Sequence, residues 1–281
     1  MKAIVLSFDP HLEIANLVVE SYKRLWPDCP LRFRIPFTER DPASIFHAEN
    51  VEFVPTPSDI RSTMENLLRD LPEQEFVFWC IDDRFPIEIF NVAALWAVFD
   101  FVSGQPSNID SIKLTDLTVE GVQGKIEKSK SIQFLKNFRR TRRSREDTNW
   151  RQQEEGTTRD PSFALGGQQF FRQLGHPKNG FYMPQFTTPA FLKRFFFASD
   201  LPAIYGIRDF HRFLLSGKFE HESYFPGKFL LSVGESTFGG KLSAACHAQM
   251  IRLGLTPPRI EIVNDYKIYS DREPAIVPSN V

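Results

Sequence analysis

Two adjacent carboxylates end one of the most apolar stretches of the chain. The stretch FVFWCIDDRF covers residues 76–85, and its run of aromatic and β-branched side chains up to Ile81 is typical of a strand buried on both faces. Asp82 and Asp83 follow directly. An ionised carboxylate at the end of such a strand is unfavourable by several kcal/mol unless a cation or hydrogen bonds offset the cost. The pair is therefore expected to have a positively charged or hydrogen-bonding partner.

Other polar residues fall where further predicted strands end. In an open α/β sheet, ligands bind in the crevice outside the carboxyl ends of the strands. Arg61 falls in the first turn of a predicted helix, where a cation is unfavourable for the helix dipole, so contact with an anion is the more natural role. Carboxylates for a divalent metal, with an arginine and helix amides for phosphate, predict a mixed site. The residues expected at this edge are Ser7 and Asp9 after the first strand, Thr56 and Arg61 around the third, and Asp82 and Asp83 after the fourth.

Each of these residues also has an ordinary structural interpretation. The two adjacent carboxylates could cap a following helix or pair with Arg84. Asp9 could cap the helix that follows it, and Arg61 could pair with Glu65 one turn further on. The residue types alone leave both interpretations open.

The elements that must position these residues alternate between strand and helix patterns. The order predicts an α/β fold built on a single open mixed sheet of Rossmann-like type, with helices on both faces. The predicted strands cover residues 3–8, 31–35, 51–54 and 76–81, and the predicted helices cover 15–26, a segment from a Ser58 cap to Leu71, and a segment from Pro86 to about Val102.

The C-terminal part is predicted to be helical and rich in phenylalanine. Phe191, Leu192, Phe195 and Phe196 lie at helical spacing, and most of these rings are expected in the core. A strand is predicted over residues 229–233 and a last helix over 242–253.

A basic segment separates the two parts. Residues 125–145 contain nine Lys or Arg against one acid, Glu127, a local balance of +8 in a chain whose net charge is −1. Residues 144–168 are polar with few apolar anchors, which predicts a mobile loop. Such a segment is most often solvated, and it could also attract an anionic membrane surface.

Composition limits the class of protein. The 281 residues include 28 Phe and nearly balanced charges, which argues against a general nucleic-acid coat. Three widely spaced cysteines indicate neither a disulfide framework nor a zinc site, and the six histidines show no metal-ligand spacing. No predicted segment has membrane-spanning length, so a cytoplasmic location is expected, with any contact to the inner membrane surface being peripheral.

The segment SDIRSTMENLLRDLPEQEFVFWCIDDRF, together with the order of elements before it, resembles nucleotide-sugar glycosyltransferases of the GT-A type, especially bacterial enzymes that build surface polysaccharides. In that family the corresponding strand ends in Glu-Asp or Asp-Asp, and these carboxylates hold the metal on the donor's diphosphate. The resemblance implies that Asp82 and Asp83 anchor Mg²⁺ or Mn²⁺. The commoner Asp-x-Asp pattern places both carboxylates on one face, whereas adjacent residues can reach one ion only if the chain turns at Asp82.

A second segment, FYMPQFTTPAFLKRFFFASDLPAIYGIRDF, resembles the acceptor side of the same enzymes. The resemblance places Phe191 where tryptophan is usual and Asp209 where an acid faces the acceptor, which implies that Asp209 is the general base of an inverting transfer, with Glu235 in reserve. Asp209 could equally pair with Arg208 or Arg212, and Glu235 could be a loop cap. The resemblance covers residues 1–100 and 180–255.

The resemblance implies a hexosyltransferase-type glycosyltransferase. It would move a sugar from a nucleotide sugar to a hydroxyl on a glycan or lipid-linked glycan. Residues 1–124 would form the nucleotide-sugar-binding half, 125–168 a basic loop, and 169–281 the acceptor-side half of the same domain.

Two alternatives remain. A nucleotidyltransferase also uses acidic metal ligands in an α/β crevice, but it should carry a glycine-rich loop after its first strand, and SFDPHLEI has no glycine. A non-catalytic binding module could use the basic segment 125–145 to dock on an anionic membrane or nucleic acid, with a steep salt dependence.

Overall fold

The computed structural model describes residues 1–104, 109–115, 120–122, 161–175, 180–205, 209–210, 213, 221–238, 240–263 and 267–269. The basic segment 125–145 lies outside these residues, as does most of the predicted loop that contains it. The last residues of that predicted loop form a short strand, Phe163–Leu165.

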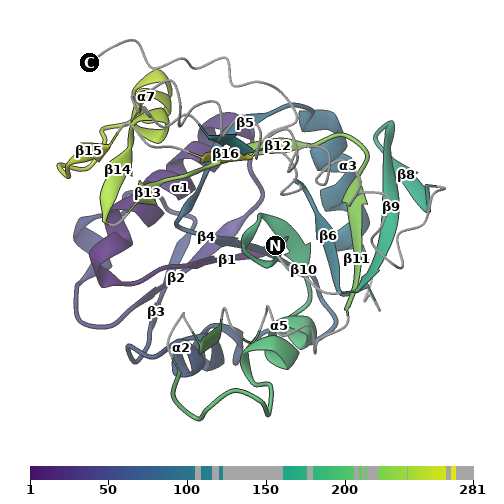
Figure 1. Ribbon diagram of the computed structural model, residues 1–281, viewed down its shortest axis with the longest axis horizontal. Helices are drawn as coiled ribbons and strands as arrows, with labels where there is room; N and C mark the ends of the chain where they lie inside the picture. Colours follow the sequence, from purple (N-terminus) through teal and green to yellow (C-terminus); the bar gives the residue numbers. More distant parts are fainter. Residues whose placement is uncertain are drawn as a thin grey trace, which may run out of the picture.

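A nine-stranded mixed sheet forms the centre of the protein (Figure 1). Its strands are β1 (Lys2–Leu6), β2 (Arg32–Phe37), β3 (Val51–Pro55), β4 (Val77–Ile81), β6 (Ser111–Lys113), β8 (Phe163–Leu165), β9 (Gln168–Gly175), β10 (Gln185–Thr187) and β11 (His221–Pro226). Their order is β3-β2-β1-β4-β10-β6-β11-β9-β8. The first four strands are mutually parallel, and β10 is antiparallel to both β4 and β6. Strand β6 therefore runs in the same direction as β4.

Two smaller sheets complete the described strands. One has the order β5-β12-β16-β7, with β5 (Arg84–Ile89), β12 (Leu231–Glu235), β16 (Lys267–Tyr269) and β7 (Glu120–Val122). The other joins β13 (Thr237–Phe238), β14 (Lys241–Ser243) and β15 (Ile262–Val263). The helices are α1 (Leu12–Leu25), α2 (Ile60–Leu68), α3 (Val92–Ser103), α5 (Pro189–Phe196) and α7 (Ala244–Arg252), with short 3₁₀ turns η1 (Asp9–His11), η2 (Pro42–Ser44) and η3 (Gly180–Tyr182).

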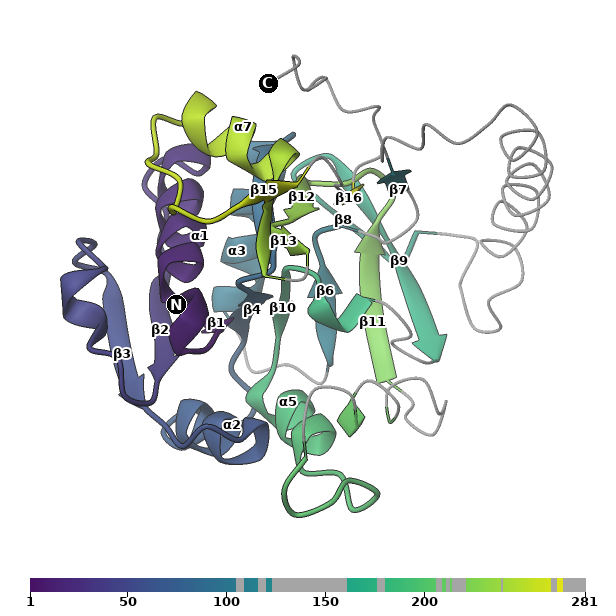
Figure 2. The same cartoon turned by 60° about the vertical axis from the view of Figure 1, so that its left-hand side comes forward.

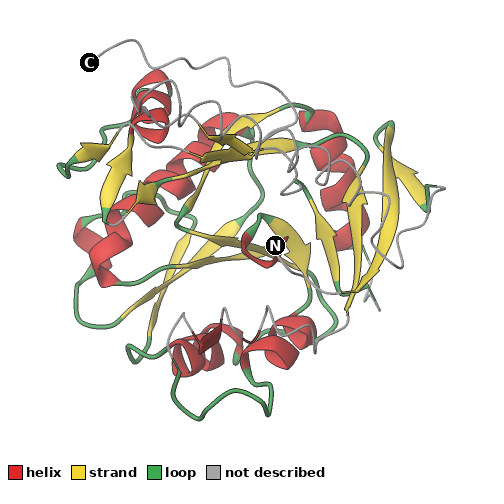
Figure 3. Ribbon diagram, in the orientation of Figure 1, coloured by secondary structure: helices red, strands yellow, loops and turns green. Residues whose placement is uncertain are grey.

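Alternate residues of the central strands pack into two separate cores. Ala3 and Phe78 belong to the core that contains α1 and α3, whereas Ile4 and Trp79 belong to the core that contains α2 and α5. We refer to the two sides of the sheet as the α1 face and the α5 face. Figures 2 and 3 show the helices grouped on these two sides. The predicted mixed α/β sheet with helices on both faces is confirmed, as is the burial of the fourth strand on both faces.

The prediction of a helix that begins at Pro86 is wrong for the first residues of that segment. Residues Arg84–Ile89 form β5, and α3 begins only at Val92, with Asn91 as its cap. Pro86 lacks a backbone N–H and is tolerated because β5 is an edge strand that pairs with β12 alone, at an irregularity between Ser232 and Val233. A proline near a helix start and a proline in an edge strand look alike in sequence.

Other element boundaries differ by a few residues from expectation. Helix α2 is capped by Asp59 rather than Ser58, because the Asp59 carboxylate accepts a hydrogen bond from the Ser62 amide at 2.9 Å. The helix expected from Leu242 begins at Ala244, and the preceding residues form β14. The strand expected over 229–233 is β12, shifted by two residues. Within the described part of the chain, no helix is both long and apolar enough to span a membrane.

Candidate functional site

The connections of the parallel strands diverge between β1 and β4. Strands β2 and β4 are the two neighbours of β1 in the sheet. Helix α1 connects β1 to β2 and packs on the α1 face, whereas α2 connects β3 to β4 and packs on the α5 face. Ligands of open α/β sheets bind at such a switch point, outside the carboxyl ends of the strands. Here the residues after β1, 7–11, meet the residues after β4, 82 and 83.

Asp82 is the most enclosed acid of this crevice. The residue is 6% exposed, and its Oδ2 accepts a hydrogen bond from the Ser7 hydroxyl at 2.7 Å. The Asp82 amide donates to the carbonyl of Leu6 at 3.1 Å, which continues the pairing of β4 with β1 for one more residue. Because side chains alternate along a strand, Ser7 follows Val5, and Asp82 follows Cys80, onto the α1 face. The predicted proximity of Ser7 and Asp82 is thus observed.

His11 completes this cluster, and the sequence analysis missed it. Its Nδ1 lies 3.3 Å from Oδ2 of Asp82, at ion-pair distance although not in hydrogen-bond geometry. The Asp82 carboxylate raises the pKa of His11, and burial opposes the shift to a smaller extent. The imidazole also packs against the ring of Phe8, with 4.3 Å between ring centroids. The only signal in the sequence was its position just after the first strand, because a lone histidine has no diagnostic spacing.

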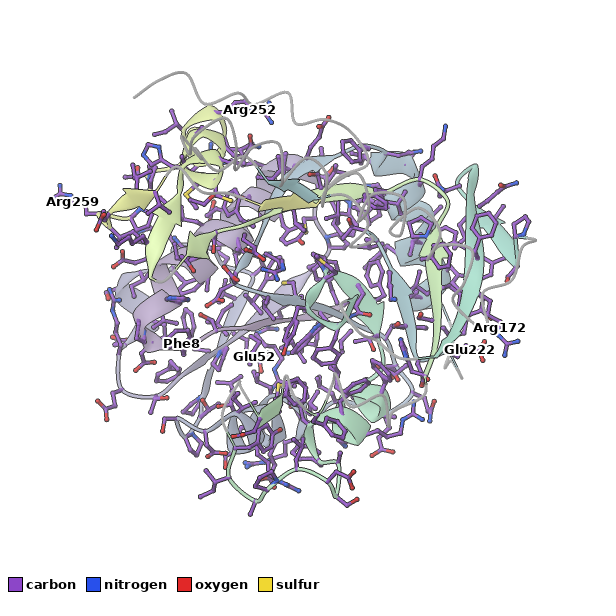
Figure 4. The ribbon with its side chains drawn as sticks, viewed as in Figure 1. Phe8, Glu52, Arg172, Glu222, Arg252 and Arg259 are labelled. Atoms are coloured by element: carbon purple, nitrogen blue, oxygen red, sulfur yellow. The ribbon has the colours of Figure 1, made fainter. Side chains whose placement is uncertain are left out.

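Phe8 is an exposed aromatic ring beside the crevice. Its side chain is 53% exposed, although it directly follows a buried strand (Figure 4). Exposing a large apolar ring to water is unfavourable, and the exposed ring offers a flat surface on which a ligand ring can stack.

Asp83 points away from Asp82. Its Oδ1 accepts hydrogen bonds from the Thr237 amide at 3.1 Å and from the hydroxyls of Thr237 and Ser236 at 3.3 Å each. Its Oδ2 accepts from Nη1 of Arg84 at 3.0 Å. Burial raises the pKa of Asp83, Arg84 and the Thr237 amide oppose this rise, and the charge of Asp82 adds to it. The carboxylate therefore holds β13 against the β4–β5 turn.

Glu235 joins the same cluster through Arg84. The two residues lie opposite each other in the β5–β12 pair, and Arg84 Nη2 is 3.4 Å from Glu235 Oε1. Arg84 thus bridges Asp83 and Glu235. The ion pair with Arg84 that the sequence suggested for the two adjacent acids is formed by Asp83. Glu235 is the last residue of β12 and is 9% exposed. The structure therefore brings Ser7, Asp82, Asp83 and Glu235 to one place.

Asp82 and Asp83 do not converge on a common point. Asp82 faces Ser7 and His11, whereas Asp83 faces Thr237 and Arg84, so a metal bound by both carboxylates would require Asp83 to leave its partners. Among the residues that the structure describes, no three His, Cys, Asp or Glu are grouped to hold a metal ion. Asp82 alone fits a divalent ion that shares its remaining ligands with phosphate and water. Metal binding at this turn stays a prediction.

Asp9 has a structural partner that was not anticipated. Its carboxylate accepts hydrogen bonds from the backbone amides of Thr38, Glu39 and Arg40, at 2.8, 2.7 and 2.8 Å. Burial acts to raise the pKa of Asp9, but the three amides and the Arg40 charge outweigh it and lower the pKa. Asp9 therefore ties the loop after β2 to the crevice rather than capping α1.

Thr56 and Arg61 lie on the α5 face of the crevice. Thr56 is buried, and its hydroxyl accepts a hydrogen bond from that of Thr63 at 3.5 Å. Nη1 of Arg61 donates to the carbonyl of Pro202 at 3.2 Å, and its guanidinium lies 5.6 Å from the ring centroid of Phe197. The contacts of Arg61 join α2 to the chain that follows α5. A role of Thr56 or Arg61 in donor binding stays a prediction.

Asp209 lies next to the core of the α5 face. It is a half-buried helical residue, and the adjacent Phe210 stacks on Phe196 with 4.6 Å between ring centroids. Arg208 and Arg212, its suggested ion-pair partners, lie outside the described residues. Its role as a base stays a prediction.

Comparisons with known proteins give limited similarity. No protein-family model matches the sequence, and no curated protein matches it. The structure is similar to the galactosyltransferase LgtC in complex with donor and acceptor sugar analogs, with 13% identity, a TM-score of 0.40, and coverage of 94% of this chain and 86% of LgtC. It is also similar to an active-site mutant of LgtC, with 13% identity, a TM-score of 0.38, and coverage of 80% and 72% of the two chains. At such values the function has to be inferred from the residues of the site.

Proposed function

We propose that this chain is a glycosyltransferase that moves a sugar from a nucleotide diphosphate donor to a hydroxyl of a glycan or lipid-linked glycan. The observation that carries the proposal is the buried Asp82, held by Ser7 and His11 at the switch point of the sheet. An acid with a purely structural role is most stable on the surface, where water solvates its charge. A buried carboxylate in a ligand crevice is better explained by a charged ligand.

The donor nucleotide would lie across the ends of β1 and β4. The exposed Phe8 ring offers a stacking surface for its base, and the first amides of α1 lie just beyond, where the helix dipole favours phosphate. Arg61 and Thr56 would line the opposite side of the crevice. Asp9 would act indirectly, by holding the loop at residues 38–40 in place.

Asp82 would hold a divalent ion, Mg²⁺ or Mn²⁺, which when bound supplies Lewis-acid charge for the departing diphosphate. Ser7 and His11 position the Asp82 carboxylate, and a protonated His11 adds positive charge beside the phosphates. Asp209 would take the proton of the attacking acceptor hydroxyl onto a carboxylate oxygen, as an inverting transfer requires. Glu235 is second choice as a base because Arg84 already pairs with it.

A thermal-shift series tests the proposal. Nucleoside diphosphates and nucleotide sugars, each with and without Mn²⁺, should raise the melting temperature of the wild-type protein, since a ligand that binds only the folded state stabilises it. Asp82→Asn should lose most of the Mn²⁺-dependent part of that shift. The matched control is Asp100→Asn, which changes an exposed acid on α3 and should respond like the wild type. Failure of every nucleotide to stabilise the protein would refute the proposal.

The base assignment needs a separate test. Asp209→Asn should bind the nucleotide sugar normally and lose acceptor transfer on the order of a hundredfold or more. Normal transfer by this variant would move the base elsewhere, with Glu235→Gln as the next variant.

A further inference from the structure

Exposed isoleucines gather on the segment that runs from the end of α7 to β15. Six large apolar side chains are exposed among the described residues, and three of them lie on this segment. Ile251, Ile260 and Ile262 are 56%, 38% and 44% exposed. A single exposed isoleucine needs no explanation, whereas several grouped together are typical of an interaction surface. We call residues 251–262 the α7–β15 corner.

The rest of the protein holds this corner in place. Helix α7 packs against β15, so the two ends of the segment lie together, at one corner of the molecule in Figures 1 and 2. Leu253 and Leu255 pack on the α1 core, and Nη1 of Arg24 donates a hydrogen bond to the carbonyl of Leu253. Gly254 has a φ of +68°, and a Cβ there would lie only 3.0 Å from that Nη1. The corner is thus a fixed part of the fold, with its leucines inside and its isoleucines outside.

The corner is also positively charged. Arg252 and Arg259 are exposed, and Figure 4 shows both at the outline of the molecule. Glu261, the one acid of the segment, is neutralised by Lys241, whose Nζ lies 2.6 Å from Oε1 of Glu261. Within the described part of the chain, neither Arg252 nor Arg259 has a carboxylate partner. The two guanidinium groups are therefore available to an anionic partner.

Isoleucines and unpaired arginines on one surface match the chemistry of an anionic lipid membrane. Apolar side chains at such a surface enter the boundary between head groups and acyl chains. Arginines beside them are attracted by the negative surface potential and can contact lipid phosphates. The order of the residues places each arginine next to an isoleucine, Ile251 beside Arg252 and Arg259 beside Ile260.

We propose that the α7–β15 corner docks on the surface of an anionic lipid membrane. Ile251, Ile260 and Ile262 enter the head-group region, and Arg252 and Arg259 contact lipid phosphates. The docking is peripheral, and it uses folded residues outside the basic segment 125–145.

The corner lies close to the crevice. Thr237, whose amide donates to Asp83, pairs with Leu242, and Leu242 pairs with Ile262. Two strand spacings, about 10 Å, therefore separate the chain at Ile262 from the chain that holds the acidic turn. A membrane against the corner would bring a lipid-linked acceptor to this edge of the crevice. That last step rests on the proposed function, whereas the docking itself does not.

Vesicle cosedimentation with the full chain tests the docking. The wild type should bind vesicles of phosphatidylcholine and phosphatidylglycerol more tightly than vesicles of phosphatidylcholine alone, and added salt should weaken the binding. Arg252→Gln/Arg259→Gln should bind the mixed vesicles about 25-fold more weakly, because each arginine near an anionic surface contributes about fivefold. Ile251→Ser/Ile260→Ser should weaken the binding about tenfold, since less apolar surface enters the head-group region.

Matched controls change the same residue types elsewhere on the surface. Arg32→Gln/Arg69→Gln removes the same charge from exposed arginines on β2 and at the end of α2. Ile204→Ser changes an isoleucine that is 78% exposed but lies in the chain after α5. Both controls should bind the mixed vesicles like the wild type. All of these substitutions are at exposed residues, so the melting temperatures should stay close to that of the wild type.

Three results would overturn the proposal. The first is a wild type that does not bind the mixed vesicles. The second is wild-type affinity in both corner variants, which would assign any membrane binding to another part of the chain. The third is an equal loss in the control variants, which would show an unspecific effect of charge or apolar surface. If the corner variants change only the mass of the protein in solution, the corner is an interface between protein chains instead. Vesicle binding needs no nucleotide, so its failure and the failure of the proposed function are separate results.

Discussion

The two halves of the nine-stranded sheet place their polar side chains differently. In the parallel half, the central strands β1 and β4 are apolar on both faces, and polar side chains gather only where these strands end. In the mixed half, β10, β6 and β11 carry buried polar side chains along one whole face. The first half is an apolar support with a polar site at its edge, whereas the second half buries polar side chains inside the protein.

Both halves contain buried polar groups, and in both halves some of them are hydrogen-bonded. Arg34 on β2 is 4% exposed, and it donates to the carbonyl of Leu67 at 2.8 Å and to Asp70 at 2.7 Å. Among the described residues, the hydroxyls of Ser21 on α1 and of Ser111 and Ser223 in the mixed half have no hydrogen-bond partner.

Loss of the support should have the largest effect. Trp79 is fully buried on β4, and its Nε1 donates to the carbonyl of Phe181 at 2.7 Å. Trp79→Ala should lower the free energy of unfolding by about 3 to 5 kcal/mol, because it leaves a large cavity and removes one of the two hydrogen bonds to the Phe181 carbonyl. Denaturant titration measures the change. Phe101→Ala, at a 43% exposed ring, should cost far less, and equal losses would contradict the contrast between support and surface.

The edge site should respond in activity rather than in stability. Asp82→Asn keeps the size of the side chain and its place beside Ser7, but it removes the charge. We expect transfer to fall by about a hundredfold, because several kcal/mol of charge stabilisation would be lost. Donor hydrolysis and acceptor transfer measure this, with Asp100→Asn as the control. Full activity in Asp82→Asn would remove the edge site from the mechanism.

Asp83 should show a compromise between stability and function. Burial raises its pKa in the folded protein, so the ionised form is disfavoured there, and the folded state gains relative stability as the pH falls through that raised pKa. Asp83→Asn should therefore raise the melting temperature at pH 7, and the gain should vanish below the ordinary carboxyl pKa. Thermal unfolding of both proteins from about pH 3 to about pH 7, the range in which carboxyl groups titrate, tests this pH dependence. A lower melting temperature at neutral pH would mean that the hydrogen bonds to Arg84 and Thr237 outweigh burial.

Asp9 should give the smallest effect and the opposite sign. Its pKa is lowered in the folded protein, so its contribution to stability is present above the ordinary carboxyl pKa and is lost as the pH falls through the lowered value. Asp9→Asn should cost less than about 1 kcal/mol at neutral pH, since the group is near the surface. The difference from the wild type should disappear in acid. A cost that is independent of pH would point to packing rather than to the carboxylate charge.

Much of the parallel half could be predicted from the sequence. The alternation of apolar runs with amphipathic helices is local information, and burial of residues 76–81 on both faces requires the two-sided core that the structure has. The meeting of Ser7 and Asp82 was also predictable, since parallel strands bring their carboxyl ends to one edge. The β5 strand could not be predicted in this way. Pro86 fits in it because β5 pairs with β12, a strand about 150 residues further along the chain.

The sequence by itself determined that acids would end a buried strand of an open α/β sheet, because periodicity and strand order are properties of the chain. Only the tertiary structure decided what those acids contact. Asp82 meets His11, Asp83 meets Arg84 and Thr237, and Asp9 meets the loop after β2. The buried polar side chains of β6, β10 and β11 likewise come together only after folding, since the register of the sheet aligns these three strands. Hydrogen bonds between residues distant in sequence depend on side-chain directions that no local pattern encodes.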